Sequence, residues 1–449
     1  MSWHRSSITL SVLSLVAAVA LAGRADEKTV PVNWPQWRGA GGDGIVPDQP
    51  LALSWSETSG LAWKCPLPEW GDSTPVVWGD AVFVTSQVDD RDLVLLKIAR
   101  KTGQVEWTRT VGQSSATRAK PTHKSGEDRG QTKFHLTQNL ASPSPVTDGE
   151  RVIAHFGNGD LAAYDFAGKL LWKRNLQQDE GPYSIWWGHA NSPVLHGGLV
   201  ISICLQDSCK DLGVKPIDSY VIAHDVRTGE VRWKTIRNTP AVGEPCDSYT
   251  TPILWQHGGR TEMVVMGGQM LDAYDPSSGK QLWSMPDLTG NRVIPSPVAG
   301  KDTVYAIQGM RDPLVAIRPR GDGVRPHEEI VWTSDKGMSD SPSPVLAGDI
   351  LFMVNNDGIL HAFDAGQGSL IWKHRIAGSY RASPFVSGGR VYLVNTTGVC
   401  TVVAASRRFE QLGENRLEDE MFASPVVSGG QILLRGRKTL YCVNRAGGT

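Results

Sequence analysis

The sequence predicts an all-β fold, an eight-bladed β-propeller of four-stranded antiparallel blades. Residues 341–372 repeat the order of signals in residues 142–172, with four short apolar runs separated by glycine turns. Such units recur along the chain, most of them 40 to 59 residues apart, and most end in tryptophan. This period is typical of a propeller, in which neighbouring blades cover each other's half-buried faces. The prolines that begin the eight units are Pro75, Pro145, Pro193, Pro252, Pro297, Pro344, Pro384 and Pro425.

The first segment, residues 1–22, has the features of a signal peptide. Arg5 precedes the apolar run 8–21, and the small residues 20–22 form a cleavage site. A retained membrane anchor is the alternative, although the run is short for a span. No cysteine occurs before Cys65, which argues against a lipid-modified N-terminus. We therefore expect an exported, periplasmic protein whose mature chain has no transmembrane span.

The next segment, residues 23–58, is expected to be an N-terminal arm lying across the ring. Its stretch Asn33–Gly44 (NWPQWRGAGGDG) is glycine-rich, but no strand and helix flank the glycines as they would in a nucleotide-binding loop. The propeller is then expected to occupy residues 59–449.

The propeller is predicted to close through its N-terminal strand. Three strands of blade eight are visible in the sequence, the last at Tyr441–Val443. The segment SGLAWKCPL carries Gly60 and Trp63 in the pattern of the missing fourth strand. Pairing of this strand with the last blade would remove the one open edge between blades.

The end of each unit carries the pattern Ala-x-Asp-x-x-Thr-Gly-x-x-x-Trp, as at Ala223–Trp233. Glycine allows the tight turn, and an indole at a fixed distance can pack between blades. Residues 319–329 interrupt this pattern in blade five, and blade seven lacks the tryptophan. The tryptophans expected to dock in this way are Trp63, Trp107, Trp172, Trp233, Trp283, Trp332 and Trp372.

This pattern resembles the tryptophan-docking motif of eight-bladed propellers of the pyrroloquinoline quinone (PQQ) type, over residues 60–442. The arm resembles that of exported, planctomycete-type members. The group includes quinoprotein alcohol dehydrogenases, in which PQQ occupies the channel, calcium polarises the quinone and an aspartate acts as base. It also includes BamB-like scaffold proteins of outer-membrane protein assembly. The sequence has no vicinal cysteine pair, no haem motif, no recognisable calcium set and no lipid-anchor cysteine of the BamB kind.

The residues just before each proline are expected to surround the mouth of the central channel. This polar rim suits a small polar ligand or a peptide, with a solvated funnel as the alternative. The candidate ligand-binding residues are Asn139, Trp187, His189, Tyr249, Arg292 and Arg381, and the acids considered for catalysis are Asp340, Glu420 and Asp72. Arg292 and Arg381 could hold carboxylates with two hydrogen bonds each. A purely structural role for His189 is the alternative to ligand binding.

The six cysteines include no CxxC pair, so we expect no zinc site. Cys204 and Cys209 flank a short polar loop and are the candidate disulfide, with two buried thiols as the alternative. Two insertions, residues 108–141 and 204–218, are expected on the mouth face, where repeat proteins often bind partners.

A net charge of −1 argues against a nucleic-acid surface. We therefore expect a monomeric, BamB-like binding or scaffold protein, with a protein partner or small polar ligand at the channel mouth. The alternative is a dehydrogenase of alcohols or sugars that uses PQQ and calcium. No cofactor is assigned by the sequence itself.

Overall fold

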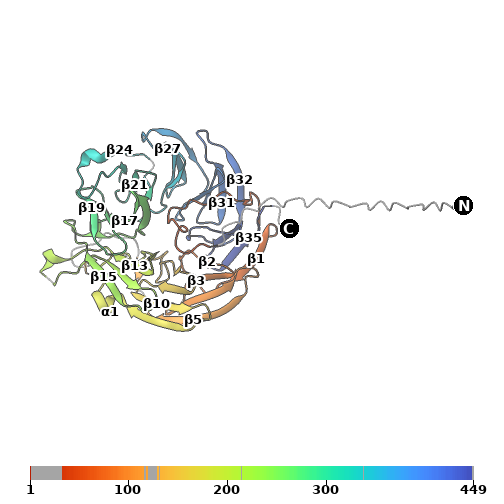
Figure 1. The fold of residues 1–449 in the computed structure, drawn as a ribbon, viewed down its shortest axis with the longest axis horizontal. Helices are drawn as coiled ribbons and strands as arrows, with labels where there is room; N and C mark the ends of the chain where they lie inside the picture. Colours follow the sequence, from red (N-terminus) through yellow and green to blue (C-terminus); the bar gives the residue numbers. More distant parts are fainter. Residues whose placement is uncertain are drawn as a thin grey trace.

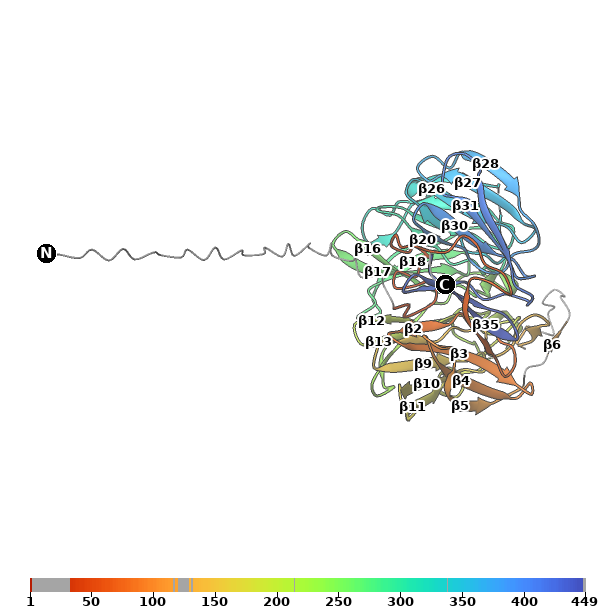
Figure 2. The same cartoon turned by 90° about the vertical axis from the view of Figure 1, so that its right-hand side faces the viewer.

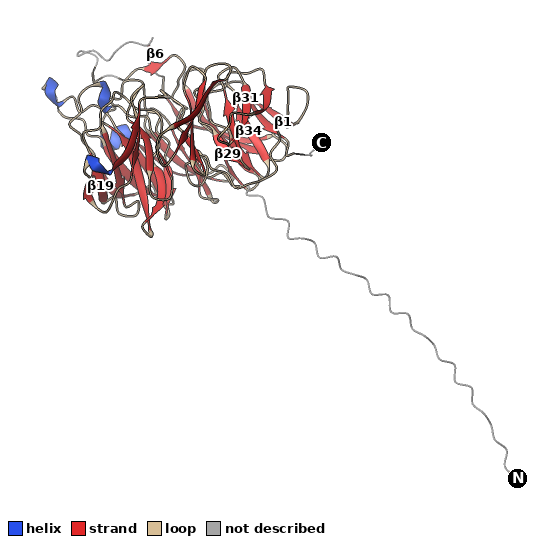
Figure 3. Cartoon of the chain, turned by 90° about the horizontal axis from the view of Figure 1, so that it is seen from above, coloured by secondary structure: helices blue, strands red, loops and turns tan. Residues whose placement is uncertain are grey.

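The computed structural model describes Met1 and residues 33–115, 118–119, 129–130, 132–213, 215–336 and 338–446. Strands form nearly all of its regular structure (Figure 3), and eight antiparallel sheets are arranged around one axis (Figure 1). The predicted eight-bladed propeller is confirmed. The expected signal peptide lies, apart from Met1, outside the described residues.

Blades one to four contain their strands in sequence order. Blade one has β2 (Val76–Trp78), β3 (Ala81–Val88), β4 (Asp92–Ala99) and β5 (Val105–Gln113); blade two has β8 (Val146–Thr147), β9 (Arg151–His155), β10 (Asp160–Asp165) and β11 (Leu170–Asn175). Blade three has β12 (Val194–His196), β13 (Leu199–Cys204), β14 (Tyr220–Asp225) and β15 (Val231–Ile236); blade four has β16 (Ile253–His257), β17 (Arg260–Gly267), β18 (Met270–Tyr274) and β19 (Gln281–Met285). In blade one, β2 lies toward the axis and β5 at the outer edge (Figure 1).

Blades five to eight repeat this arrangement. Blade five has β20 (Val298–Ala299), β21 (Val304–Ile307), β22 (Leu314–Ile317) and β24 (Ile330–Ser334); blade six has β25 (Val345–Ala347), β26 (Ile350–Val354), β27 (Ile359–Asp364) and β28 (Leu370–Arg375). Blade seven has β29 (Phe385–Ser387), β30 (Arg390–Val394), β31 (Val399–Ala404) and β32 (Gln411–Arg416); blade eight has β33 (Val426–Ser428), β34 (Gln431–Arg435) and β35 (Thr439–Val443), completed by β1 (Leu61–Pro66).

The remaining elements are short. They are α1 (Leu176–Glu180), the parallel pair β6 (Arg118–Ala119) and β7 (Phe134–His135), and 3-10 turns at Lys210–Leu212, Glu244–Cys246 and His327–Glu329. Figure 3 shows β6 on one face of the disc. Among the described residues there is no helix with the length and apolar character that a membrane span requires.

The insertion in blade five adds a strand to its neighbour. Within residues 319–329, β23 (Gly323–Val324) pairs in parallel with β19, so that Trp283 lies opposite Gly323. Blade four is therefore a five-stranded sheet, and part of its outer edge is covered.

Closure of the ring follows the prediction. β1 pairs antiparallel with β35, and Trp63 lies opposite Cys442. In Figure 1, β1 at the red end of the sequence lies beside β35 at the blue end, and Figure 2 shows β35 and β3 where blades eight and one meet. At this seam the buried Arg435 donates to the carbonyl oxygens of Ser73 at 2.7 Å and Thr85 at 2.5 Å.

The tryptophans of the repeat lie between blades. Trp63, Trp172, Trp283 and Trp332 are buried, whereas Trp107, Trp233 and Trp372 are half-buried. Five indole nitrogens donate, at 2.8–3.1 Å, to a carbonyl of the next blade: Trp63 to Arg100, Trp107 to Phe166, Trp172 to Val226, Trp332 to Ala365 and Trp372 to Ser406. Trp283 is different, because it donates to Glu262 of its own blade at 2.6 Å.

The indoles also lie against the turn glycines of the next blade. Gly229 has a φ of +69°, and a Cβ there would lie 2.6 Å from the ring of Trp172. Gly103 and Trp63 stand in the same relation, also at 2.6 Å. Glycine therefore meets two requirements at these positions, the left-handed backbone and the close approach of the indole.

The described part of the arm crosses the ends of the inner strands. Trp34 and Val77 exchange two backbone hydrogen bonds, and Thr147 N–H donates to Pro35 O at 2.8 Å. On the other side of the ring, Gly44 O accepts from Val386 N–H at 2.9 Å. Trp34 also belongs to a hydrophobic cluster shared with blades seven, eight and one. The arm thus joins parts of the ring that are far apart in sequence.

Candidate binding site at the channel mouth

A cavity of about 440 Å³ lies on the propeller axis, since residues from all eight blades line it. Trp37 of the arm also lines it. Next to Trp37, Arg38 is 2% exposed and donates to Pro344 O at 2.6 Å. Burial lowers the pKa of Arg38 to about 10. The arm therefore contributes an aromatic side chain to the cavity wall, and the neighbouring Arg38 ties the arm to blade six.

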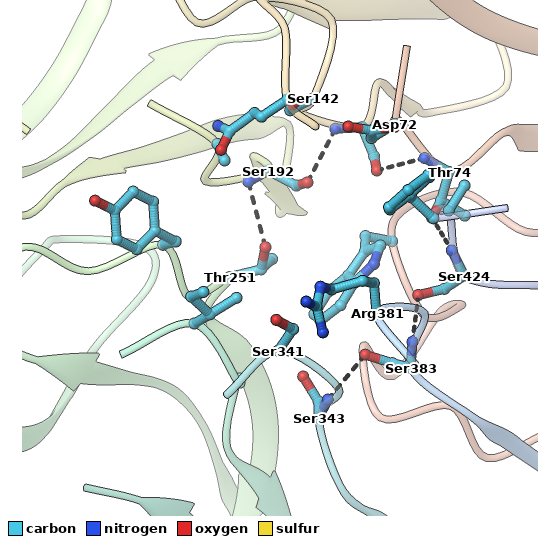
Figure 4. A pocket seen from close by; sticks show the side chains of 18 of the residues that line it. Asp72, Thr74, Ser142, Ser192, Thr251, Ser341, Ser343, Arg381, Ser383 and Ser424 are labelled. Atoms are coloured by element: carbon cyan, nitrogen blue, oxygen red, sulfur yellow. Dashed lines mark hydrogen bonds between the residues drawn. The ribbon is translucent and has the colours of Figure 1, made fainter. Parts of the chain in front are cut away.

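A closed circle of hydrogen bonds surrounds the cavity, and Figure 4 shows the part of it that runs from Thr251 by way of Thr74 to Ser343. Each residue that precedes one of the eight prolines is a serine or threonine, and its backbone N–H donates to the hydroxyl of the next blade. The members, in order, are Thr74, Ser144, Ser192, Thr251, Ser296, Ser343, Ser383 and Ser424, with the last donating to Thr74, and the N···O distances are 2.7–3.2 Å. We call this set the hydroxyl ring.

The sequence accounts for the backbone of the hydroxyl ring. A residue before proline is restricted to extended conformations, and the proline itself has no N–H to donate. The N–H of the preceding residue is therefore the one that each blade can direct along the circle.

The two rim arginines differ in their partners. Arg292 is tied to two carboxylates, with Nη1 3.0 Å from Asp340 Oδ1 and Nε 3.2 Å from Glu244 Oε1. Arg381 is exposed and donates to Tyr380 O at 3.1 Å. Among the described residues, no carboxylate lies within ion-pair distance of Arg381. Arg381 is thus the rim cation that remains available to a ligand.

Aromatic and polar side chains complete the mouth. Trp187 lines the cavity, and its backbone N–H donates to the hydroxyl of the buried Tyr249 at 3.1 Å. The ring of His135 meets that of Trp187 edge-on, with centroids 5.7 Å apart. Burial lowers the pKa of His135, and the charges of Arg381 and Arg292 lower it further. A neutral imidazole therefore stands beside Arg381 near neutral pH.

His135, Thr137 and Gln138 line the cavity but were not among the predicted site residues. They belong to the first insertion, whose expected place on the mouth face was the only signal for them. An ion-pair cluster joins this insertion to the second one. Arg129 binds Asp207 and Asp211, with two nitrogens 2.7 Å from carboxylate oxygens.

Several predicted site residues do line the cavity: Asp72, Trp187, Tyr249, Arg292, Asp340 and Arg381. Asn139, His189 and Glu420 do not. Asn139 is buried and donates to Trp70 O at 2.9 Å, and Glu420 forms an exposed ion pair with Arg437 at 2.8 Å. Neither side chain is placed to contact a ligand in the channel.

His189 has a structural environment. It is fully buried, its Nε2 lies 2.9 Å from Ile203 O, and its ring stacks on Tyr183 with centroids 4.9 Å apart. Burial lowers its pKa to about 4. This is the structural role that the sequence left open for it.

The candidate disulfide is not formed. Cys204 has a free thiol at the end of β13, where it packs in a cluster with Tyr183 and Tyr220. Cys209 lies in the following loop and donates to Arg129 O at 3.3 Å. The two side chains lie in different surroundings, and no disulfide joins them although they are close in sequence.

Comparison with known proteins points to one family by sequence. A family model described as outer membrane protein assembly factor BamB matches residues 40–213, 214–325 and 323–408. A curated relative, the outer membrane protein assembly factor BamB of Burkholderia pseudomallei (strain K96243), is 24% identical over 341 residues. The match covers 72% of this chain and 71% of that relative.

Solved structures of two kinds share the fold. BamB from Moraxella catarrhalis superposes with a TM-score of 0.57 at 13% identity, covering 85% of this chain and 99% of that one. The quinohemoprotein alcohol dehydrogenase from Comamonas testosteroni superposes with a TM-score of 0.60 at 14% identity, covering 93% and 81%. At these identities, the likeness to the solved structures shows the fold and nothing further.

Proposed function

The chain belongs to the family described as outer membrane protein assembly factor BamB, and on that premise we propose that it is an exported, periplasmic binding or scaffold protein. The mature chain works as a monomer, and the mouth of its channel binds a protein partner or a small polar ligand. The observation that carries this proposal is the cavity lined by all eight blades, with Arg381, Trp187 and the hydroxyl ring facing it.

The acids of the rim support binding rather than chemistry. Asp340 is engaged by Arg292, and Glu420 lies outside the cavity in an ion pair with Arg437. Asp72 lines the cavity near the buried Arg435, whose pKa burial lowers to about 10 although the charge of Asp72 raises it in part. A general base needs a carboxylate directed at the reacting group. Asp340 is held by Arg292 and Glu420 lies outside the cavity, so neither of these two acids is placed for that role.

Site-specific photo-crosslinking in cells tests the proposal. Leu136 is 49% exposed next to His135 at the mouth, whereas Val231 is 48% exposed on β15 at the outer edge. A crosslinker at residue 136 should yield a discrete adduct whose partner is identified by mass spectrometry, and one at residue 231 should not. Adducts at residue 231 alone would contradict the proposed binding face.

Export is tested separately. The chain isolated from the periplasmic fraction should begin immediately after residue 22, and light scattering of this purified form should give the mass of one chain. A cytoplasmic chain that retains Met1 would contradict the proposed export.

A PQQ-dependent dehydrogenase is the second candidate, because a rim arginine and an aromatic side chain stand at the mouth. The residues do not fit the whole cofactor. PQQ is a tricarboxylate, yet Arg292 is already paired, and Asp72 and Asp340 add negative charge to the rim. Within the part of the chain that the structure describes, no three side chains of His, Cys, Asp or Glu gather as metal ligands. We therefore derive no reaction step through this group.

Loading experiments distinguish the two candidates. After incubation with PQQ and calcium, the purified protein should show no bound quinone absorbance and no dye-linked oxidation of ethanol or glucose. Turnover that disappears in Asp340→Asn or Arg381→Ala would favour the dehydrogenase.

A further inference from the structure

The hydroxyl ring has hydrogen-bond donors that the protein does not use. Each hydroxyl oxygen accepts one backbone N–H, as described above. In the described residues, none of the eight hydroxyls donates to another protein atom. A hydroxyl carries one donor and can accept through two lone pairs, so each member keeps its O–H for another group. Seven of the eight, all except Ser296, line the cavity.

The ring is sheltered from bulk water. All eight members are at most 6% exposed. Buried donors without an acceptor cost free energy, so the cavity favours a group with several acceptor atoms. Because these donors surround the axis, one occupant of the cavity can accept hydrogen bonds from hydroxyls of several blades.

Arg381 adds a positive charge above the ring. In the view of Figure 4, its side chain lies near the middle of the group of serine and threonine hydroxyls. Charge-assisted hydrogen bonds from a guanidinium to a carboxylate are about twice as strong as neutral ones. Asp340 does not compete for this cation, because it pairs with Arg292 at 3.0 Å.

We propose that the channel binds a carboxylate group, held by Arg381 at the mouth and by hydroxyls of the ring below it. This inference rests on the proposed function and specifies the chemistry of the ligand at the same site. A carboxylate accepts hydrogen bonds and donates none, which matches a circle of unused donors. A metal cation does not match, because it would approach Arg381 and would use lone pairs rather than O–H groups.

The carboxylate can come from a small organic acid or from the C-terminus of a peptide. The cavity, at about 440 Å³, has the volume of a small-ligand site. Two pairs of probes separate these sources: succinate against succinamide, and N-acetyl-trialanine with a free C-terminus against the same peptide with a C-terminal amide. Each pair changes the charge and acceptor character while nearly keeping the size.

Isothermal titration of the mature protein with these probes is the test. At least one free acid should bind, and its amide should bind roughly tenfold more weakly or not at all. Arg381→Gln should weaken the free acid by roughly tenfold or more. Arg375→Gln is the matched control, because Arg375 is also exposed but lies outside the cavity at the end of β28, and its affinity should equal that of the wild type.

The ring has its own matched pair. Thr251→Val removes the hydroxyl and keeps the shape, so binding should weaken about threefold to tenfold, whereas Thr251→Ser keeps the hydroxyl and should bind like the wild type. Because Thr251→Val also removes the acceptor of Ser192 N–H, its folding is checked by thermal denaturation. If this variant does not fold, the comparison of Arg381→Gln with Arg375→Gln still decides.

Equal binding of acid and amide, or unchanged affinity in Arg381→Gln, would overturn the proposal. So would failure of all free acids to bind at millimolar concentration, which would leave water as the occupant of the ring. The failure of the proposed function would give a different result. Carboxylates would then bind to the purified protein, whereas a crosslinker at residue 136 would yield no adduct with a partner in cells. A partner crosslinked at residue 136 without carboxylate binding would leave the binding face standing and remove this inference.

Discussion

At the residue scale, the absence of a side chain at one glycine allows an indole of the preceding blade to pack against the backbone. At Gly229, the backbone has a φ of +69° and the indole of Trp172 leaves no room for a methyl group. Gly389 has the same φ of +69°, but a Cβ there would meet no atom within 4 Å. The two positions therefore separate the cost of the left-handed backbone from the cost of disturbing the docked indole.

We predict that Gly229→Ala lowers the free energy of unfolding by about 2–4 kcal/mol, since it combines backbone strain with overpacking. Gly389→Ala should cost about 1–2 kcal/mol, from the backbone alone. Urea denaturation of both variants measures the difference. Equal losses would show that the indole moves aside at no cost.

Buried histidines make the fold sensitive to acid. Burial lowers the pKa of His189 and of His224 to about 4, and it lowers that of His155 well below 6.5. Between about pH 6.5 and pH 4, the unfolded chain binds more protons at these sites than the folded chain does. The free energy of unfolding should therefore be constant near pH 7.5 and fall as the pH drops through this range.

Chemical denaturation at a series of pH values measures this effect. His189→Gln should flatten the dependence between pH 6.5 and 4, because it removes one of the titrating groups. His327 is exposed, and His327→Gln should leave the curve unchanged. His155 and His224 should keep part of the loss, so a dependence in His189→Gln as steep as that of the wild type would show that His189 does not contribute to it.

At the scale of elements, repetition made the blades predictable. In each unit, glycine turns separate the apolar runs and so give the positions of the strands. The tryptophan that follows a turn glycine lies in the outer strand. The repeat also located the closing strand, since Gly60 and Trp63 match a pattern that blade eight lacks. β23 was not predictable, because residues 319–329 are an insertion and the repeat says nothing about where they pack.

The candidate site was less predictable for a related reason. The loops before the prolines differ in length, and side chains along an extended segment alternate between two directions. Asn139 and His189 are buried and do not line the cavity, whereas Tyr249 and Arg381 do, and the distance of a residue from its proline does not separate the two groups. The hydroxyls that precede the prolines were visible in the sequence, but their partners lie on the next blade, about a whole unit away.

The six-residue strand β1 closes the whole ring, because it completes blade eight by pairing with β35. Deletion of residues 60–67 should leave the edge of β35 unpaired, and the protein should aggregate or lose most of its stability. The matched control replaces residues 320–325 with a glycine-serine linker, which removes β23 but leaves blade four with four strands. Light scattering and thermal denaturation compare the two. If both variants behave alike, ring closure is not the reason for the loss.

At the scale of the whole molecule, the arm connects blade seven to blades one and two, which are not its neighbours in the ring. Its backbone and side chains bond to inner strands on both sides of the axis, at Val77, Thr147 and Val386. Removal of residues 33–50 should therefore weaken the whole ring rather than a single blade. It should also remove Trp37 from the wall of the cavity.

Hydrogen exchange tests this role. The amides of Val77, Thr147 and Val386 donate to the arm, so their exchange should quicken in the truncated protein by more than that of Thr251, which donates to Ser296. Unchanged protection at the first three amides would mean that the arm is not needed to order the inner strands.

The pairing of β1 with β35 also sets an order in time. β1 (Leu61–Pro66) is synthesised before all the other strands of the propeller, whereas its partner β35 (Thr439–Val443) is synthesised after them. Until then, β1 and the inner faces of the first and last blades have no permanent neighbour, and the ring cannot reach its final form by adding blades one at a time. Pairings between segments so distant in sequence form slowly, because the loop between them must close first. We therefore expect the newly made chain to pass through an open state before the ring closes, in which the edge of β35 is exposed to pairing with an extended segment of another protein.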